Sequence, residues 1–147
     1  MGYLYENGLE DEDTGRTILE PNADKALSYY SKAASKHFPR AMNNLATFYF
    51  GNEKYRDERK CLRYLEDAAE AEYVKALHNL GVINYEGKLV PYNEEKAKNL
   101  IRRAAEKGDI EGRIMYTELL LNDANSCTFD QLADLNKFCR EIIAKDE

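Results

Sequence analysis

Apolar residues recur along this chain at the three- and four-residue intervals that are typical of amphipathic helices, and short polar linkers separate the segments that carry them. The pattern predicts two alternating series of helices. The first helices are expected near 1–7, 39–50, 74–86 and 109–122. The second helices are expected near 22–36, 57–71, 93–107 and 129–144. The sequence therefore predicts an all-α fold built from helix pairs.

The helical pattern repeats at intervals of 35 and 36 residues, because the pair Ala33-Ala34 recurs as Ala68-Ala69 and as Ala104-Ala105. A fixed period between about 20 and 50 residues is typical of solenoids. Other positions keep the same period: Ala41, Ala76 and Gly112, then Leu45, Leu80 and Tyr116, then Ala46, Gly81 and Thr117. Small residues at fixed positions let two helices approach closely. We predict a single repeat domain over 1–147, with units near 1–37, 38–72, 73–108 and 109–147.

The predicted helix ends carry recognisable stop and start residues. Asn22, Asp57 and Asn93 stand just ahead of second helices, where a side-chain oxygen can accept hydrogen bonds from first-turn amides. Four glycines, Gly8, Gly51, Gly87 and Gly108, are expected in left-handed turns after helices.

The last predicted helix differs from the repeat because it lacks the double alanine. It opens with a capping-box pattern, Thr128-Phe129-Asp130-Gln131. Its apolar stripe is predicted to be Leu132, Leu135, Cys139, Ile142 and Ile143, and its polar side Lys137, Arg140, Glu141 and Lys145. A solenoid must cover its last apolar face, so we predict a C-terminal capping helix.

These residues carry a family resemblance. The motif consists of Leu80-Gly81, Gly87, Val90-Pro91, Lys96-Ala97 and the run from Arg103 to Gly108. It resembles the Sel-1-like repeat, a relative of the tetratricopeptide repeat, and the resemblance covers about residues 1 to 123. It implies a right-handed α-α superhelix that acts as a non-catalytic protein-interaction scaffold or adaptor. The start of the chain, from Gly2 to Gly8, resembles a first helix whose beginning is missing, so we expect a fragment of a longer protein.

Composition narrows the class of partner. The formal net charge is -6 and acidic and basic residues are interleaved, whereas nucleic-acid binding needs clustered cations. We therefore expect no nucleic acid as partner. No window of the sequence approaches the 18 or so consecutive apolar residues that a membrane-spanning helix needs. We therefore expect no direct membrane insertion. Three cysteines without a paired motif and the absence of a glycosylation acceptor favour the cytoplasm, with the endoplasmic reticulum lumen as the alternative if a parent chain has a signal peptide.

The sequence offers no catalytic, cofactor or metal site. Its only histidines are His37 and His78, and no known catalytic motif surrounds them. The acidic segment Glu10-Asp11-Glu12-Asp13 lacks the spacing of a calcium loop, so we predict a solvated insertion over 9–21. Tyr29, Tyr30, Tyr64, Tyr116 and Cys61 are predicted to pack in the core against neighbouring helices. Cys127 lies in a polar linker, where an intermolecular or regulatory thiol is the alternative to a plain exposed residue.

In tetratricopeptide modules the first helices line a concave groove, and the resemblance extends this expectation to Asn44 and Asn79. Each amide side chain is expected either to form hydrogen bonds with the backbone of a bound peptide or to form hydrogen bonds with the neighbouring helix. The other residues expected on this partner-binding face are Tyr3, Arg40, Asn43, Thr47, Phe50, Lys75, His78, Val82 and Tyr85. We predict an acidic-hydrophobic peptide or a neighbouring domain as the partner, with Arg40 and Lys75 meeting carboxylates. The alternative is an ordinary solvated helix surface.

Two other functional interpretations stay open. In the first, the repeats are a regulatory module that docks intramolecularly on a catalytic or membrane domain of a longer parent chain. In the second, the chain is an adaptor of a membrane ubiquitin ligase, as the resemblance implies for some proteins with such repeats.

Overall fold

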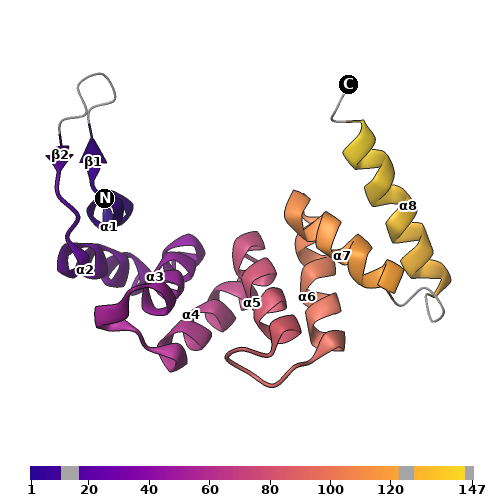
Figure 1. Ribbon diagram of the computed structural model, residues 1–147, viewed down its shortest axis with the longest axis horizontal. Coiled ribbons are helices and arrows are strands. Elements are labelled where there is room, and N and C mark those ends of the chain that lie inside the picture. The colour runs from indigo at the N-terminus through magenta and orange to yellow at the C-terminus, as the bar shows by residue number, and fades with distance from the viewer. Residues whose placement is uncertain (11–16, 123–127, 145–147) are drawn as a thin grey trace. The chain divides into compact units, whose positions relative to one another are not determined.

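The computed structural model describes residues 1–10, 17–122 and 128–144 of the 147 residues (Figure 1). The helices are α1 (Gly2–Asn7), α2 (Ala23–Ala34), α3 (Pro39–Gly51), α4 (Glu58–Glu70), α5 (Val74–Glu86), α6 (Glu94–Glu106), α7 (Ile110–Asn122) and α8 (Phe129–Ile143). A 3-10 helix, η1 (Glu53–Tyr55), precedes α4. The predicted helices are therefore confirmed, with ends that differ by one or two residues at most.

The chain divides into two compact units, Met1–Tyr73 and Val74–Glu147. In the first unit α1 packs on α2, α2 on α3 and α3 on α4. In the second unit α5 packs on α6, α6 on α7 and α7 on α8. Each unit thus contains two helix pairs, and the single domain expected from the repeat stays a prediction.

The predicted helix starts are confirmed. Asn22, Asp57 and Asn93 each accept a hydrogen bond from the backbone N–H three residues later, at 2.9, 3.0 and 2.9 Å. At the start of α8, Thr128 N–H donates to Gln131 Oε1 (2.8 Å) and Gln131 N–H donates to Thr128 Oγ1 (3.3 Å). This reciprocal pair is the capping box that the sequence predicts.

The turns after second helices share a left-handed residue that is not always glycine. Gly108 has φ 100°, and the equivalent positions in the two preceding repeats, His37 and Glu72, both have φ 58°. A side chain in this region costs about 1 kcal/mol or more relative to glycine. Gly8 and Gly87 are left-handed as predicted, but Gly51 is not, because it is the last residue of α3.

Close contact between paired helices depends on matched small and large residues. An added Cβ at Gly2 would lie 2.6 Å from Tyr30 Cε1, and one at Gly81 would lie 2.5 Å from Ile101 Cδ1. In the intervening repeat the equivalent positions are Ala46 and Leu65, both buried. Glycine therefore occurs in the two repeats in which the facing side chain of the paired helix is a tyrosine or a β-branched isoleucine.

The capping helix α8 faces inward through a residue that the sequence interpretation did not select. Phe138 is 1% exposed and meets Tyr116 edge to face, with ring centroids 6.1 Å apart. Leu132, predicted to be inward, is 50% exposed, so this part of the predicted stripe is wrong. Glu141, predicted on the outer side, forms an ion pair with Arg113 at 2.7 Å, while Lys137 and Arg140 are exposed as predicted. The side chains of Leu135, Ile142 and Ile143, and all of Lys145, lie outside the described part.

The insertion of the first repeat contains a short strand pair instead of the plain loop predicted there. Strand β1 (Leu9–Glu10) pairs antiparallel with β2 (Thr17–Leu19), with Leu9 opposite Leu19 (Figure 1). Its acidic residues 11–13 fall outside the described ranges. Where the chain re-enters the helical part, Asn22 N–H donates to Tyr5 C=O at 2.6 Å. The insertion is thus tied to α1 at the point where α2 begins.

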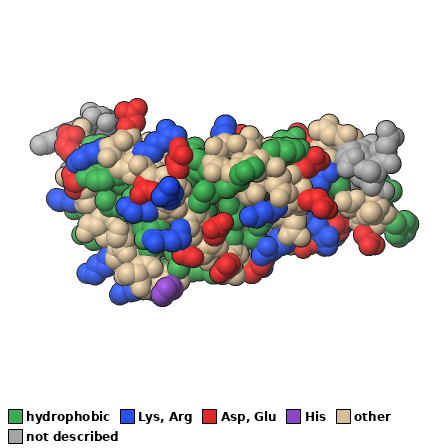
Figure 2. Space-filling model, turned by 90° about the horizontal axis from the view of Figure 1, so that it is seen from below, with side chains coloured by type: hydrophobic (Ala, Val, Ile, Leu, Met, Phe, Trp, Pro, Cys, Tyr) green, Lys and Arg blue, Asp and Glu red, His purple; other side chains and the backbone are tan. Residues whose placement is uncertain are grey.

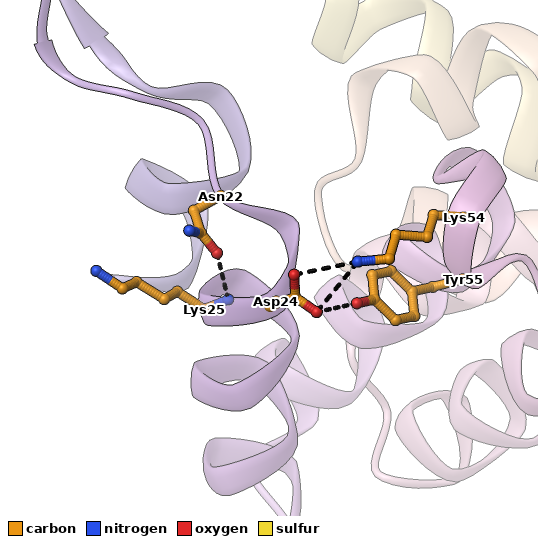
Figure 3. Close-up of polar contacts among 5 residues, drawn as sticks. All are labelled: Asn22, Asp24, Lys25, Lys54 and Tyr55. Carbon is orange, nitrogen blue, oxygen red and sulfur yellow. Dashed lines mark hydrogen bonds and ion pairs between the residues drawn. The ribbon is translucent and has the colours of Figure 1, made fainter.

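Polar contacts connect α2 to the linker between α3 and α4. Asp24 forms an ion pair with Lys54 at 3.1 Å and accepts a hydrogen bond from the Tyr55 hydroxyl, both on η1 (Figure 3). These contacts keep the pKa of Asp24 below its ordinary value, with the Tyr55 hydrogen bond as the main cause. They place η1 over the start of α2.

The predicted packing roles are confirmed for most, but not all, of the singled-out side chains. Tyr30, Tyr116 and Cys61 are buried. Tyr64 stacks on Tyr49 with ring centroids 6.2 Å apart. Tyr29 stacks on Tyr5 of the neighbouring helix α1, with ring centroids 5.4 Å apart, but it is 42% exposed, so its predicted burial in the core is wrong.

Candidate functional site

The first-helix surface of the first unit is formed by α3. Arg40, Thr47 and Phe50 are exposed and Asn44 is partly exposed, whereas Asn43 is only 4% exposed. Asn43 therefore contributes almost no surface to a partner, which corrects its predicted place on the binding face. The Thr47 hydroxyl donates to Asn44 C=O at 2.9 Å.

A surface hollow of about 610 Å³ opens beside this helix. Its aromatic walls are Tyr3, Tyr29, Tyr30 and Phe38. Arg40 and Asn44 are among its other lining residues, so the hollow combines aromatic faces with one cation and one amide. Aromatic and arginine side chains of this kind dominate the energetics of many protein interfaces.

The corresponding surface of the second unit is formed by α5. Lys75 is exposed, and His78, Asn79, Val82 and Tyr85 are partly buried. The His78 Nδ1 lies 2.6 Å from Asp109 Oδ2, and the same carboxylate oxygen accepts the Gly112 N–H at 2.9 Å. Because an ionised carboxylate only accepts hydrogen bonds, Nδ1 of His78 carries the hydrogen. Asp109 therefore both starts α7 and connects it to α5.

Two clefts lie side by side along α5 and α7 and share His78 and Glu111 among their linings. The first, of about 510 Å³, also contains Lys75, Asn79 and Asp109. The second, of about 460 Å³, contains Val82, Tyr85, Ile114 and Met115 together with Glu86, Glu111 and Glu118. The first cleft is polar, and the second combines an apolar floor with carboxylates.

The structure thus brings the predicted site residues together in two groups, one on each unit. Arg40 and Asn44 line the hollow beside α3, and Lys75, His78, Asn79, Val82 and Tyr85 line the clefts beside α5. Phe50 lies apart from the hollow, with the Arg56 guanidinium 5.8 Å from its ring centroid. Asn79 has an interaction partner within the chain, which is consistent with a bond between helices. The choice between that role and peptide reading stays open for Asn44.

Sequence reasoning missed the contribution of α7. One period after the predicted α5 residues come Glu111, Ile114, Met115, Glu118 and Leu121, and the first four of these line the second cleft. The repeat itself is the signal that could have found them. The predicted binding face ends in the third unit, and Gly112 and Thr117 weaken the motif in the fourth.

Within the described ranges no group of His, Cys, Asp and Glu side chains is arranged to hold a metal ion. No helix there is both long and apolar enough to cross a membrane. Acidic and basic side chains are interspersed over the face drawn in Figure 2. Cys127 lies outside the described residues, so its predicted exposure stays a prediction.

Comparison with known proteins identifies the repeat. A family model, the Sel1 repeat, matches residues 1–38, 39–73 and 74–109. The chain belongs to the Sel1 repeat family. The sequence-based assignment and the all-α solenoid fold class are therefore confirmed. Proteins with Sel1 repeats are generally protein-protein interaction scaffolds, and the repeats are typically not catalytic.

Relatives of this Sel1 repeat chain come from several bacteria. An uncharacterised protein of Neisseria meningitidis is 31% identical over 108 residues, which cover 73% of this chain and 22% of that protein. A Sel1 repeat protein from Oxalobacter formigenes superposes with a TM-score of 0.71 at 25% identity over 97% of this chain and 53% of its own. The chain thus spans about a fifth of the first relative's length and about half of the second's.

Two further solved structures share the architecture. Cysteine-rich protein B of Helicobacter pylori has a TM-score of 0.58 and 27% identity over 62% of this chain and 69% of its own. A protective antigen of uropathogenic Escherichia coli, described as displaying an SLR fold, has a TM-score of 0.68 over 98% of this chain and 36% of its own. At 23% identity the latter similarity concerns the fold alone.

Proposed function

We propose that this Sel1 repeat chain is a non-catalytic scaffold that binds a partner peptide or protein domain with the first-helix surfaces of its repeats. The observation that carries this proposal is a contrast between buried and exposed positions of α3, α5 and α7. Buried positions keep large, mainly apolar side chains, for example Leu45, Leu80 and Tyr116. The exposed positions at the same period change from Arg40 to Lys75 to Glu111. A repeat that conserves its packing and varies its exposed face presents a surface for recognition.

The first unit supports a partner with acidic and apolar groups. Arg40 lies at the edge of a hollow with aromatic walls, where a guanidinium can meet a carboxylate and the rings can cover apolar side chains. Lys75 is exposed at the equivalent position of α5 and can meet a second carboxylate. Rigid helices lose little conformational entropy on binding, so that modest contacts add up.

The test is a comparison of proteins retained from cell lysate by the immobilised native chain and by the variant Arg40→Glu/Lys75→Glu. A matched control, Arg59→Glu/Lys96→Glu, changes the same charge at exposed second-helix positions. Circular dichroism checks that all three chains are equally helical.

The proposal predicts a partner that the native chain and the control retain and that the Arg40→Glu/Lys75→Glu variant loses. Its affinity should weaken as the salt concentration rises, because exposed charge pairs are screened. Equal retention by all three chains would place binding elsewhere and refute the proposed surface. A chain that retains no protein at all would contradict the scaffold function.

A further inference from the structure

The second cleft of the second unit has an exposed apolar floor supported by the core. It lies beside α5 and α7 and is lined by Val82, Tyr85, Ile114 and Met115. Val82 and Met115 pack against the buried cluster that contains Ile101, Tyr116 and Phe138. Ile114 is 47% exposed. Apolar side chains that are exposed together on a rigid support mark sites of association more often than isolated ones do.

The rim of this cleft is acidic. Glu86, Glu111 and Glu118 belong to its lining, and the imidazole of His78 directs its Nδ1 hydrogen to Asp109. Glu86 forms an exposed ion pair with Lys88 at 3.0 Å. In the part of the chain that the structure describes, neither Glu111 nor Glu118 takes part in an ion pair. Two carboxylates thus stand beside apolar surface without a cation from the described chain.

The charge of this surface reverses between neighbouring repeats. Glu111 occupies the position of Lys75 and Arg40, and Glu118 occupies that of Val82 and Thr47. A carboxylate at the edge of an apolar cleft attracts cations and disfavours an acidic partner, since like charges brought together on binding are costly. The acidic partner expected for Arg40 is therefore poorly suited to this cleft.

We propose that the cleft beside α5 and α7 binds a basic-hydrophobic segment of a partner protein. A bulky aliphatic or aromatic side chain of the segment fills the floor between Val82 and Ile114. Lys or Arg residues on either side of it meet Glu111 and Glu118. This inference rests on the proposed scaffold function and adds the chemistry of one partner segment. Binding of nucleic acid or of an anionic membrane surface is disfavoured by the same carboxylates.

The probes are three fluorescein-labelled peptides of equal length, added to the full chain and followed by fluorescence anisotropy. The first alternates lysine with leucine and phenylalanine. The second replaces each lysine by glutamate, and the third replaces each apolar residue by serine. The proposal predicts saturable binding of the first peptide and at least about tenfold weaker binding of the other two.

Charge reversal at the rim provides the decisive variant. Glu111→Lys/Glu118→Lys changes two exposed positions of α7 and should weaken binding of the basic-hydrophobic peptide by about tenfold or more. Glu66→Lys/Glu70→Lys makes the same charge change on the exposed side of α4 and should leave the affinity unchanged. Ile114→Ser tests the floor without changing the charge and should also weaken binding. Circular dichroism verifies that each variant is folded.

Three outcomes would overturn the inference. The glutamate peptide could bind as tightly as the lysine peptide, or both double variants could bind alike. Sedimentation could instead show native dimers that Glu111→Lys/Glu118→Lys dissociates, in which case the occupant is a second copy of this chain. The proposed scaffold function is judged separately, by the loss of a lysate partner with Arg40→Glu/Lys75→Glu. It survives if that partner is lost while the basic-hydrophobic peptide fails to bind.

Discussion

Replacing Gly81 by alanine should destabilise the protein, although alanine is the better helix former. A Cβ at this position would lie 2.5 Å from Ile101 Cδ1 and 2.7 Å from Cγ1, whereas ordinary carbon contacts are about 3.5–4.0 Å. Ile101 would have to move by about 1 Å. It is fully buried in the cluster with Ala105, Tyr116 and Leu120, and its β-branch restricts its rotamers.

The expected magnitude follows from two opposing terms. Overpacking a tight core costs about 1–3 kcal/mol. The change from glycine to alanine inside a helix contributes about 1 kcal/mol in the other direction. We therefore expect Gly81→Ala to lower the free energy of unfolding by up to about 2 kcal/mol, combining both terms.

Urea unfolding followed by circular dichroism measures this difference. Gly51→Ala is the matched control, because Gly51 is also helical and its added Cβ would meet no atom within 4 Å apart from the adjoining residues and backbone of its own helix. This control should stabilise the protein by a few tenths of a kcal/mol, roughly the propensity term at a helix end. The two glycine-to-alanine changes should thus have opposite signs.

A double variant tests the cause. The second repeat combines Ala46 with Leu65, so Gly81→Ala/Ile101→Leu copies that pair into α5 and α6. The double variant should be more stable than the sum of the single changes indicates, by about 0.5–3 kcal/mol of coupling. The reasoning is refuted if Gly81→Ala is as stable as Gly51→Ala, or if the two changes at 81 and 101 are simply additive.

Three other predictions concern turns, caps and a buried thiol. His37 and Gly108 both have left-handed backbone conformations. His37→Gly should therefore raise the free energy of unfolding by about 0.5–1 kcal/mol, and Gly108→Ala should lower it by a similar amount. Thermal or urea unfolding that shows the same change for both variants would contradict this. Asp109→Ala should lower the free energy of unfolding by about 1–3 kcal/mol, because it removes the cap of α7 and leaves His78 Nδ1 without its acceptor. Asp109→Asn keeps a capping oxygen, so its free energy of unfolding should fall by less in the same measurement. Burial raises the pKa of Cys61 to about 11. In a Cys127→Ser/Cys139→Ser variant, a thiol reagent at pH 8 should therefore label Cys61 only after the protein unfolds. Rapid labelling of the native protein would contradict the burial of Cys61. The unfolded thiol ionises first, near pH 9.0, so the free energy of unfolding should fall as the pH rises from there toward about 11.

Several helix starts could be predicted from the sequence because their chemistry is local. Asn22, Asp57 and Asn93 each reach an N–H only three residues away, so that the motif contains both partners. The left-handed turns were predicted only where they are glycine. His37 and Glu72 adopt the same conformation because the repeat geometry around them requires it, against their own preference.

The inward face of α8 could not be predicted in the same way. Periodicity shows that a helix has an apolar side, but the neighbouring helix decides how far it is rotated about its axis. Phe138 therefore occupies the core beside Tyr116 while Leu132 is half exposed. The same reason explains Tyr29, which covers Tyr5 on the surface although its repeat position favoured the core.

The candidate site likewise combines features that follow from the sequence with features that depend on helix packing. The repeat and the helix pairs could be read from the sequence alone, since these follow from period and local capping. The binding face that includes Arg40 and Lys75 was an expectation from the family resemblance. Only the tertiary structure buried Asn43, joined His78 to Asp109 and placed Glu111 and Glu118 in the cleft that Val82 also lines. Such contacts join residues about one repeat apart, and their geometry depends on how helices pack, which no local pattern encodes.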